Sequence, residues 1–221
     1  MKIFEKILFI QLIFLMSVAV HAQELIDGLY YRLNVNKGEA KISASPVSPY
    51  SYSGAICIKP EVEYQGTKFK VVGVDGSAFY KCTSLTSVEI PSSVKVIDLC
   101  AFYGCSGLTS IDIPNSVTKI KDSAFYMCEN ITSVTIPDSV IEIGQEAFAF
   151  CANLKSLFIS DSVKKIGSSS FWDCESLQSV VLPNLLTEIE FCCFADCHNL
   201  SEINIPNSVK SIWQYAFKGC M

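Results

Sequence analysis

The residues best equipped for chemistry lie near the C-terminus, in the segment Cys192-Cys193-Phe194-Ala195-Asp196-Cys197-His198. Its thiols, imidazole and carboxylate are the ligand types of a zinc site. A cysteine beside a histidine could also act as a nucleophile with its base. Either chemistry requires these side chains to converge on one point, so the elements that carry them decide whether it is possible.

A 23-residue repeat carries this segment. Phenylalanine recurs at a fixed step of 23 residues, and a cysteine follows each phenylalanine three residues later. The pairs are Phe79 and Cys82, Phe102 and Cys105, Phe125 and Cys128, Phe148 and Cys151, Phe171 and Cys174, Phe194 and Cys197, and Phe217 and Cys220. A fixed period of this size indicates stacked units of supersecondary structure.

The repeat argues against chemistry at the cysteine-rich segment. Cys197 belongs to the repeating series, and Cys193 fills the slot that holds Ala in most other units, so their side chains should point in different directions. His198 is the only histidine outside residues 1–22, and its slot holds Thr, Ser, Glu or Ala in other units. The sequence also lacks a phosphate-binding glycine loop and an H-E-x-x-H motif. We therefore predict no metal, no cofactor and no enzymatic activity.

Each unit contains two segments that can form one coil of a solenoid. The first, Leu85–Ile90 in the first unit, follows the pattern L-x-x-L-x-L and should end as a short strand, so that stacked units form a parallel sheet. A proline ends this strand in five units, and a serine such as Ser93 follows, whose hydroxyl should bond the turn of the adjacent coil. The second segment returns the chain along the other side.

The repeated motifs A-F-x-x-C-x-x-L and I-P-x-S-V resemble those of the BspA-like (treponemal-type) bacterial leucine-rich repeat family over residues 71–221. The resemblance implies a right-handed leucine-rich-repeat coil with a short parallel β-sheet on its concave face. It also implies an exported or surface protein, since family members are often of that kind in anaerobic bacteria and some parasitic protists. Several of them look like adhesins for host matrix proteins or other microbes.

The chain divides into three parts. Residues 1–22 resemble a signal peptide, with an apolar run at Ile7–Val20 and a small-residue cleavage pattern at Val20-His21-Ala22. Residues 23–70 are predicted to form a β-hairpin-type N-terminal cap with a degenerate first repeat at Ile56–Pro60. Residues 71–221 hold six full repeats and a partial last one. We therefore predict export to the cell surface, the medium or the periplasm.

Charge and hydropathy exclude two classes of partner. The leader carries two Lys and one Glu, so the net charge of −5 for the whole chain becomes −6 for the remainder, and no basic run is present. Nucleic acid is therefore a poor partner. No segment after the leader approaches the ~20 apolar residues that a membrane span requires.

The eleven cysteines have two possible states. Exported chains of this cysteine content ordinarily form disulfides. Cysteines in equivalent slots of neighbouring units, however, seldom present the dihedral angle that a disulfide needs. We favour reduced thiols buried in the core, with a disulfide between neighbouring units as the alternative.

Three binding hypotheses follow from the repeat. The first is an interaction or adhesion module that binds a host or microbial extracellular protein through the outward row of the strands. That row comprises Glu89, Asp112, Thr135, Phe158, Val181 and Asn204. The second is a carbohydrate-binding module that uses an aromatic strip. The strip comprises Tyr80, Tyr103, Tyr126 and Trp172. The third is a structural element that self-associates through its C-terminal edge.

Overall fold

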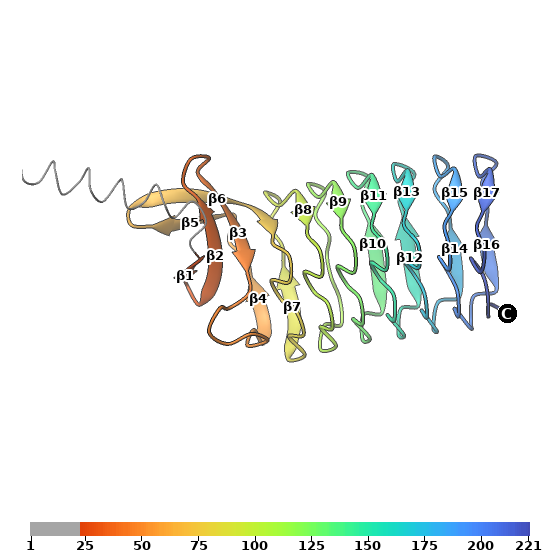
Figure 1. Cartoon of the computed structure of the whole chain (residues 1–221), viewed down its shortest axis with the longest axis horizontal. Helices are drawn as coiled ribbons and strands as arrows, with labels where there is room; N and C mark the ends of the chain where they lie inside the picture. Colours follow the sequence, from red (N-terminus) through yellow and green to blue (C-terminus); the bar gives the residue numbers. More distant parts are fainter. Residues whose placement is uncertain (1–22) are drawn as a thin grey trace, which may run out of the picture.

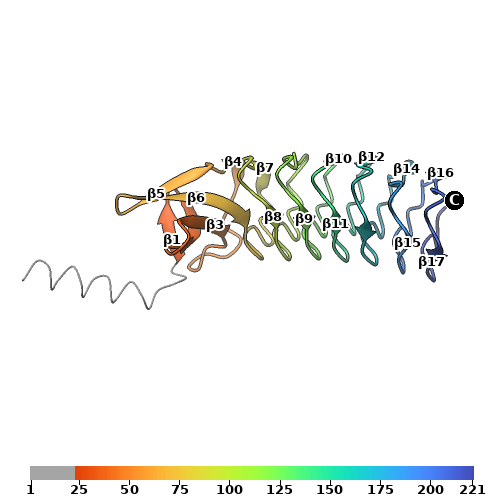
Figure 2. The ribbon, with the colours of Figure 1, turned by 90° about the horizontal axis from the view of Figure 1, so that it is seen from above.

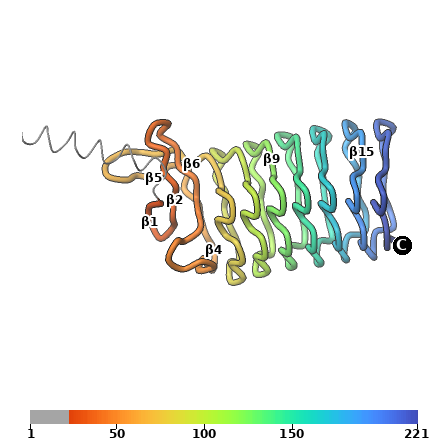
Figure 3. The backbone as a smooth tube through the Cα atoms, viewed as in Figure 1, coloured from red at the N-terminus to blue at the C-terminus, as the bar shows by residue number. Residues whose placement is uncertain are grey.

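The computed structural model describes residues 23–221, and the predicted signal peptide lies outside them. Within the described residues the fold is a solenoid built of strands and turns, without helices. The coils stack side by side along the long axis and bend little (Figures 1 and 3). The stack is nearly straight, so we call the predicted concave face the first strand face. It is the side that carries Glu89, Asp112, Thr135, Phe158, Val181 and Asn204.

The N-terminal cap is an antiparallel β-meander joined to a hairpin. Strands β1 (Gln23–Ile26), β2 (Leu29–Asn34) and β3 (Glu39–Ser43) pair in sequence, and β5 (Glu61–Tyr64) pairs with β6 (Thr67–Val74). The tight turn of the second hairpin is Gln65-Gly66, with φ of 50° and 75°, as two-residue hairpin turns require. The cap thus contains two hairpins, β2 with β3 and β5 with β6, and β1 adds a strand beside β2.

The cap continues directly into the solenoid. Strand β3 pairs in parallel with β6, and β6 pairs in parallel with β8 (Val96–Ile97) of the first full coil. Strand β4 (Gly54–Cys57) pairs in parallel with β7 (Leu85–Glu89), as expected for the degenerate repeat at residues 56–60. The cap thus covers the first coil on both of its strand-bearing sides.

Most coils carry strands on two opposite sides, as Figure 2 shows. The first side holds β7, β10 (Ser133–Ile136), β12 (Ser156–Ile159), β14 (Ser179–Val181) and β16 (Glu202–Asn204). The second side holds β8, β9 (Lys119–Ile120), β11 (Glu142–Ile143), β13 (Lys165–Ile166), β15 (Glu188–Ile189) and β17 (Ser211–Ile212). The strands of the second side were not predicted.

The parallel pairing predicted for the first side is present, but it is divided into separate two-stranded sheets. Strands pair there only as β4 with β7, β10 with β12, and β14 with β16, and residues 110–113 form no strand. Residues 110–113 contain Asp112, and aspartate is depleted in strands. Ile111 and Ile113 are still buried, so the alternation of inward and outward side chains persists without the ladder.

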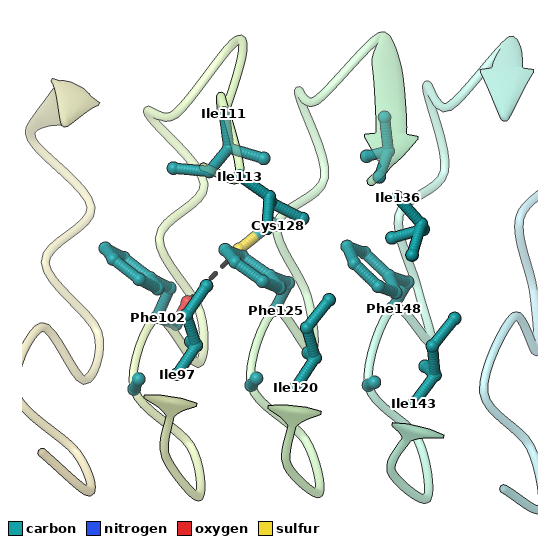
Figure 4. Close-up of a cluster of buried hydrophobic side chains, with 14 of the residues drawn as sticks. Ile97, Phe102, Ile111, Ile113, Ile120, Phe125, Cys128, Ile136, Ile143 and Phe148 are labelled. Atoms are coloured by element: carbon teal, nitrogen blue, oxygen red, sulfur yellow. Dashed lines mark hydrogen bonds between the residues drawn. The ribbon is translucent and has the colours of Figure 1, made fainter. Parts of the chain in front are cut away.

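A stack of parallel phenylalanine rings forms the centre of the core (Figure 4). The seven rings from Phe79 to Phe217 lie 4.9 to 5.8 Å apart between centroids, with interplanar angles of 2° to 11°. Tyr52 from the cap packs on Phe79 at 5.2 Å, and its hydroxyl donates to the Ser43 carbonyl. The first ring of the stack is therefore covered by the cap.

The phenylalanines lie in turns, residues 77–81 in the first unit, that stack from coil to coil and are joined by backbone hydrogen bonds. We call this stack the turn column. The N–H groups of Ser77, Phe79 and Lys81 donate to carbonyl oxygens of the next coil at 2.9, 2.7 and 2.6 Å. Ser77 and Lys81 have left-handed backbones, with φ of 59° and 54°, and the equivalent residues of later coils share this conformation. The cost of these conformations is offset because each one directs an N–H group at the neighbouring coil.

The serine that follows each proline contributes less than predicted. The Ser116 hydroxyl donates to the Val94 carbonyl of the preceding coil at 2.6 Å. The buried hydroxyls of Ser93, Ser139 and Ser208 have no partner among the described residues, so the prediction of a repeating hydroxyl contact is wrong there.

A column of alternating charge stabilises the second side. Glu142 lies between Lys119 and Lys165 in register, with carboxylate-to-ammonium distances of 2.9 and 3.9 Å. The hydrogen bond from Lys119 lowers the pKa of the Glu142 carboxyl. Its contribution to stability is therefore present above the ordinary carboxyl pKa and is lost as pH falls through the lowered one.

Replacing Glu142 with Lys is expected to lower the free energy of unfolding by about 1 kcal/mol, because three like charges would then stand in one column of partly exposed side chains. A thermal melt should show a fall of roughly 2–4 °C, and Glu142→Gln should show less than half of it. An unchanged melting temperature for the Lys variant would mean that this column of charges does not contribute to stability.

Candidate functional site

The outward row of the first strand face is exposed along its whole length. All six predicted residues, Glu89, Asp112, Thr135, Phe158, Val181 and Asn204, are exposed. Phe158 is 59% and Val181 65% exposed, although both are large and apolar. Strand register aligns Thr135 with Phe158 and Val181 with Asn204, so the members of each pair stand side by side.

A shallow hollow of about 330 Å³ lies at the N-terminal end of this row. It is lined by Glu89 and Asp112 together with Cys57, which sequence analysis did not single out. Register places Cys57 beside Glu89, and a hydrogen bond to the Glu89 carboxylate raises the pKa of the exposed thiol. The degenerate repeat could have identified Cys57, because it stands one unit before Glu89 in the same row.

The aromatic strip is longer than predicted. Tyr80, Tyr103 and Tyr126 stack at 4.8 and 4.7 Å, as expected. Phe150 then fills the gap before Trp172, and Tyr50 of the cap lies 5.9 Å before Tyr80. Both additions come from slots outside the repeating row, so the spacing gave no signal for them.

The stacking limits what the strip can bind. Successive Tyr rings are inclined by 21° and 13°, so their faces cover one another and their edges face outward. Sugar rings and cations bind preferentially to free aromatic faces. The rings of Tyr50 and Tyr80 are inclined by 43°, so their faces do not cover one another fully, and both rings line a pocket of about 190 Å³. Most of the strip is thus better suited to shielding the turn column than to binding.

The side chains of the cysteine-rich segment make separate contacts. Cys193 is buried in the core, the Cys197 thiol donates to the Phe171 carbonyl at 3.1 Å, and the exposed His198 ring bonds the Gly219 carbonyl at 3.0 Å. That bond raises the pKa of His198. Among residues 23–221 no group of three or more His, Cys, Asp or Glu side chains is arranged to hold a metal ion.

The repeating cysteines have a structural role that sequence analysis missed. Six of their thiols donate to the phenylalanine carbonyl of the preceding coil at 3.0 to 3.4 Å, and Figure 4 shows Cys128 and Phe102. Burial raises the pKa of Cys105 and Cys151 to about 12, and those of Cys128 and Cys174 well above the ordinary value. All eleven cysteines are free thiols. This geometry favours the reduced state.

The family follows from the same repeats. The family model described as "BspA type Leucine rich repeat region" matches residues 72–197 and 164–221, in six copies. This chain belongs to the BspA-type leucine-rich repeat family. No curated protein gives a significant match to it.

Solved structures place the BspA-type chain among bacterial leucine-rich repeat proteins. One from T. pallidum is 34% identical, with a TM-score of 0.74 over 83% of this chain and 82% of that one. One from Bacteroides ovatus is 30% identical, also with a TM-score of 0.74, over 89% of this chain and 57% of that one. The pneumococcal vaccine antigen PcpA is 17% identical, with a TM-score of 0.55 over 90% of this chain and 80% of that one, and shares the fold.

The last BspA-type coil differs from the others in burial. Ile212 is 52% exposed, whereas its equivalents Ile97, Ile120, Ile143, Ile166 and Ile189 are at most 1% exposed. Self-association through this edge stays a prediction, which sedimentation at several protein concentrations tests. None of the described residues lies in a helix long and apolar enough to cross a membrane.

Proposed function

We propose that the chain is an exported interaction module that binds an extracellular protein, from a host or another microbe, through the first strand face. The observation that supports this most is the exposure of Phe158 and Val181 on a regular strand array. Large apolar side chains that remain in water on an ordered surface mark interaction sites. Stacked strands also present side chains at a fixed spacing, which suits extended partners.

Export is supported by residues 1–22, whose sequence resembles a signal peptide. It directs the protein to the periplasm, the cell surface or the medium. The adhesive role is an extension from the resemblance to BspA-like adhesins. The free thiols suit a compartment that does not oxidise them, or a core that protects them by burial.

Binding of the exported, purified protein to an array of extracellular-matrix proteins and glycans tests the proposal. Phe158→Asp is expected to weaken a protein hit at least about tenfold, since it places a charge in the apolar contact. Val47→Asp is the matched control, because Val47 is 79% exposed but lies in the cap. Its binding should equal that of the unmodified protein.

Two results would contradict the proposal. One is a protein hit that Phe158→Asp leaves intact. The other is a glycan hit that Phe158→Asp leaves intact but that replacement of Tyr80, Tyr103 and Tyr126 by Ala abolishes, which would assign binding to the aromatic strip.

A further inference from the structure

The first strand face has two chemically different halves. Glu89 and Asp112 stand one coil apart at its N-terminal end, and Phe158 and Val181 stand one coil apart further along the same row. Thr135 separates the two pairs. The row therefore passes from acidic to apolar over five successive coils.

Neither carboxylate pairs with a cation among the described residues, although the Glu89 carboxylate accepts a hydrogen bond from the neutral Cys57 thiol. Eight ion pairs join side chains of residues 23–221, and neither Glu89 nor Asp112 takes part in one. On the second side, by contrast, the carboxylate of Glu142 is paired with Lys119. An unpaired carboxylate on a strand array is a favourable site for a cation of a partner.

The hollow gives the acidic half a shape as well as a charge. Its lining also includes Ser87, Ser110 and the apolar residues Ile56, Val88 and Ile90. It lies where residues 110–113 fail to continue the sheet. A lysine side chain suits this lining, because its apolar stem can contact the apolar residues while its ammonium pairs with the carboxylates.

From these features we propose that the partner presents an extended segment with a basic side chain over Glu89 and Asp112 and an apolar side chain over Phe158 and Val181. This inference rests on the proposed function and names the partner's chemistry. From Glu89 to Phe158 the row spans three coils, or about 14 Å at the usual strand spacing. An extended peptide covers that distance in about four residues. Side chains four residues apart lie on the same side of an extended chain, so both can face the row.

Synthetic peptides test this directly, with binding to the full exported protein followed by nuclear magnetic resonance titration. The probe is Lys-Ser-Ser-Ser-Phe-Ser-Leu, and its charge-reversed partner begins with Glu instead of Lys. The reversed-order peptides are included because an extended chain can run in either direction. The Lys probe in its better direction is expected to bind at least about tenfold more tightly than its Glu counterpart, with a smaller difference in high salt.

A double charge reversal supplies the decisive variant. Glu89→Lys with Asp112→Lys should reverse the preference, so that the Glu peptide binds more tightly. The matched control, Glu63→Lys with Glu188→Lys, makes the same change of charge on exposed strands away from the first strand face and should keep the original preference.

Two outcomes would overturn this inference. They are equal binding of the Lys and Glu peptides, and failure of every peptide to bind. The proposed function is judged separately, by the effect of Phe158→Asp on protein hits from the array. A protein hit that needs Phe158 but binds the double charge-reversal variant equally well would support the proposed function. It would also show that the partner needs no basic side chain over Glu89 and Asp112.

Discussion

Replacing Phe125 with Ala is expected to lower the free energy of unfolding by about 3–5 kcal/mol. The ring is fully buried and is stacked on both faces, at 5.1 Å from Phe102 and 5.0 Å from Phe148. Removing it leaves a cavity between two coils whose spacing is fixed by backbone hydrogen bonds, so the neighbours cannot collapse into it. Urea unfolding followed by circular dichroism measures the effect.

Phe158→Ala is the matched control for this variant. It removes the same atoms from a ring that is 59% exposed on the first strand face. Its effect should be within about 0.5 kcal/mol of zero. A loss below about 1 kcal/mol for Phe125→Ala would mean that the phenylalanine stack contributes little to the fold.

Raising the pH from 7 to 10 is expected to destabilise the protein by about 4 kcal/mol through Cys105 and Cys151 alone. Burial raises the pKa of both thiols to about 12, whereas a thiol of the unfolded chain ionises near pH ~8.5. The folded state therefore holds its protons more firmly. The stability that this provides is complete below about pH 8.5 and is lost as pH rises toward about 12, at ~2 kcal/mol per thiol by pH 10.

Urea unfolding at both pH values measures this loss. A variant with Cys105→Ala and Cys151→Ala should lose about 4 kcal/mol less between the two pH values than the unmodified protein does. The comparison is of differences, so any direct effect of the substitutions on stability cancels. An identical pH dependence in the two proteins would contradict the assignment of high pKa values to these thiols.

The repeat was sufficient to predict the solenoid, because Phe79 to Phe217 and their cysteines leave one arrangement in which equivalent residues meet. The exposure of Phe158 and Val181 followed from alternation in the strand motif. The backbone conformations of the turns could not be predicted from the repeat. Left-handed conformations at residues as different as Lys81, Cys100 and Glu146 leave no common residue type to recognise.

Only part of the candidate site could be predicted from the sequence. The outward row is a property of one repeated position, so its members could be named from sequence. The hollow beside Glu89 arises where residues 110–113 depart from the sheet, and Phe150 enters the aromatic strip from a neighbouring slot. Such features depend on how one coil differs from the next, and a periodic pattern carries no information about such differences.

The turn column also gives the molecule an electrical direction. At each junction from the first full coil to the last, three backbone N–H groups point toward residue 221 and the carbonyls that they meet point back, as Phe102 and Ala124 do. Peptide dipoles aligned head to tail add up, as they do along an α-helix. The column is therefore a macrodipole that lies along the solenoid axis. Its end toward residue 221 is electropositive and favours anionic groups, while its end beside the cap favours cationic ones.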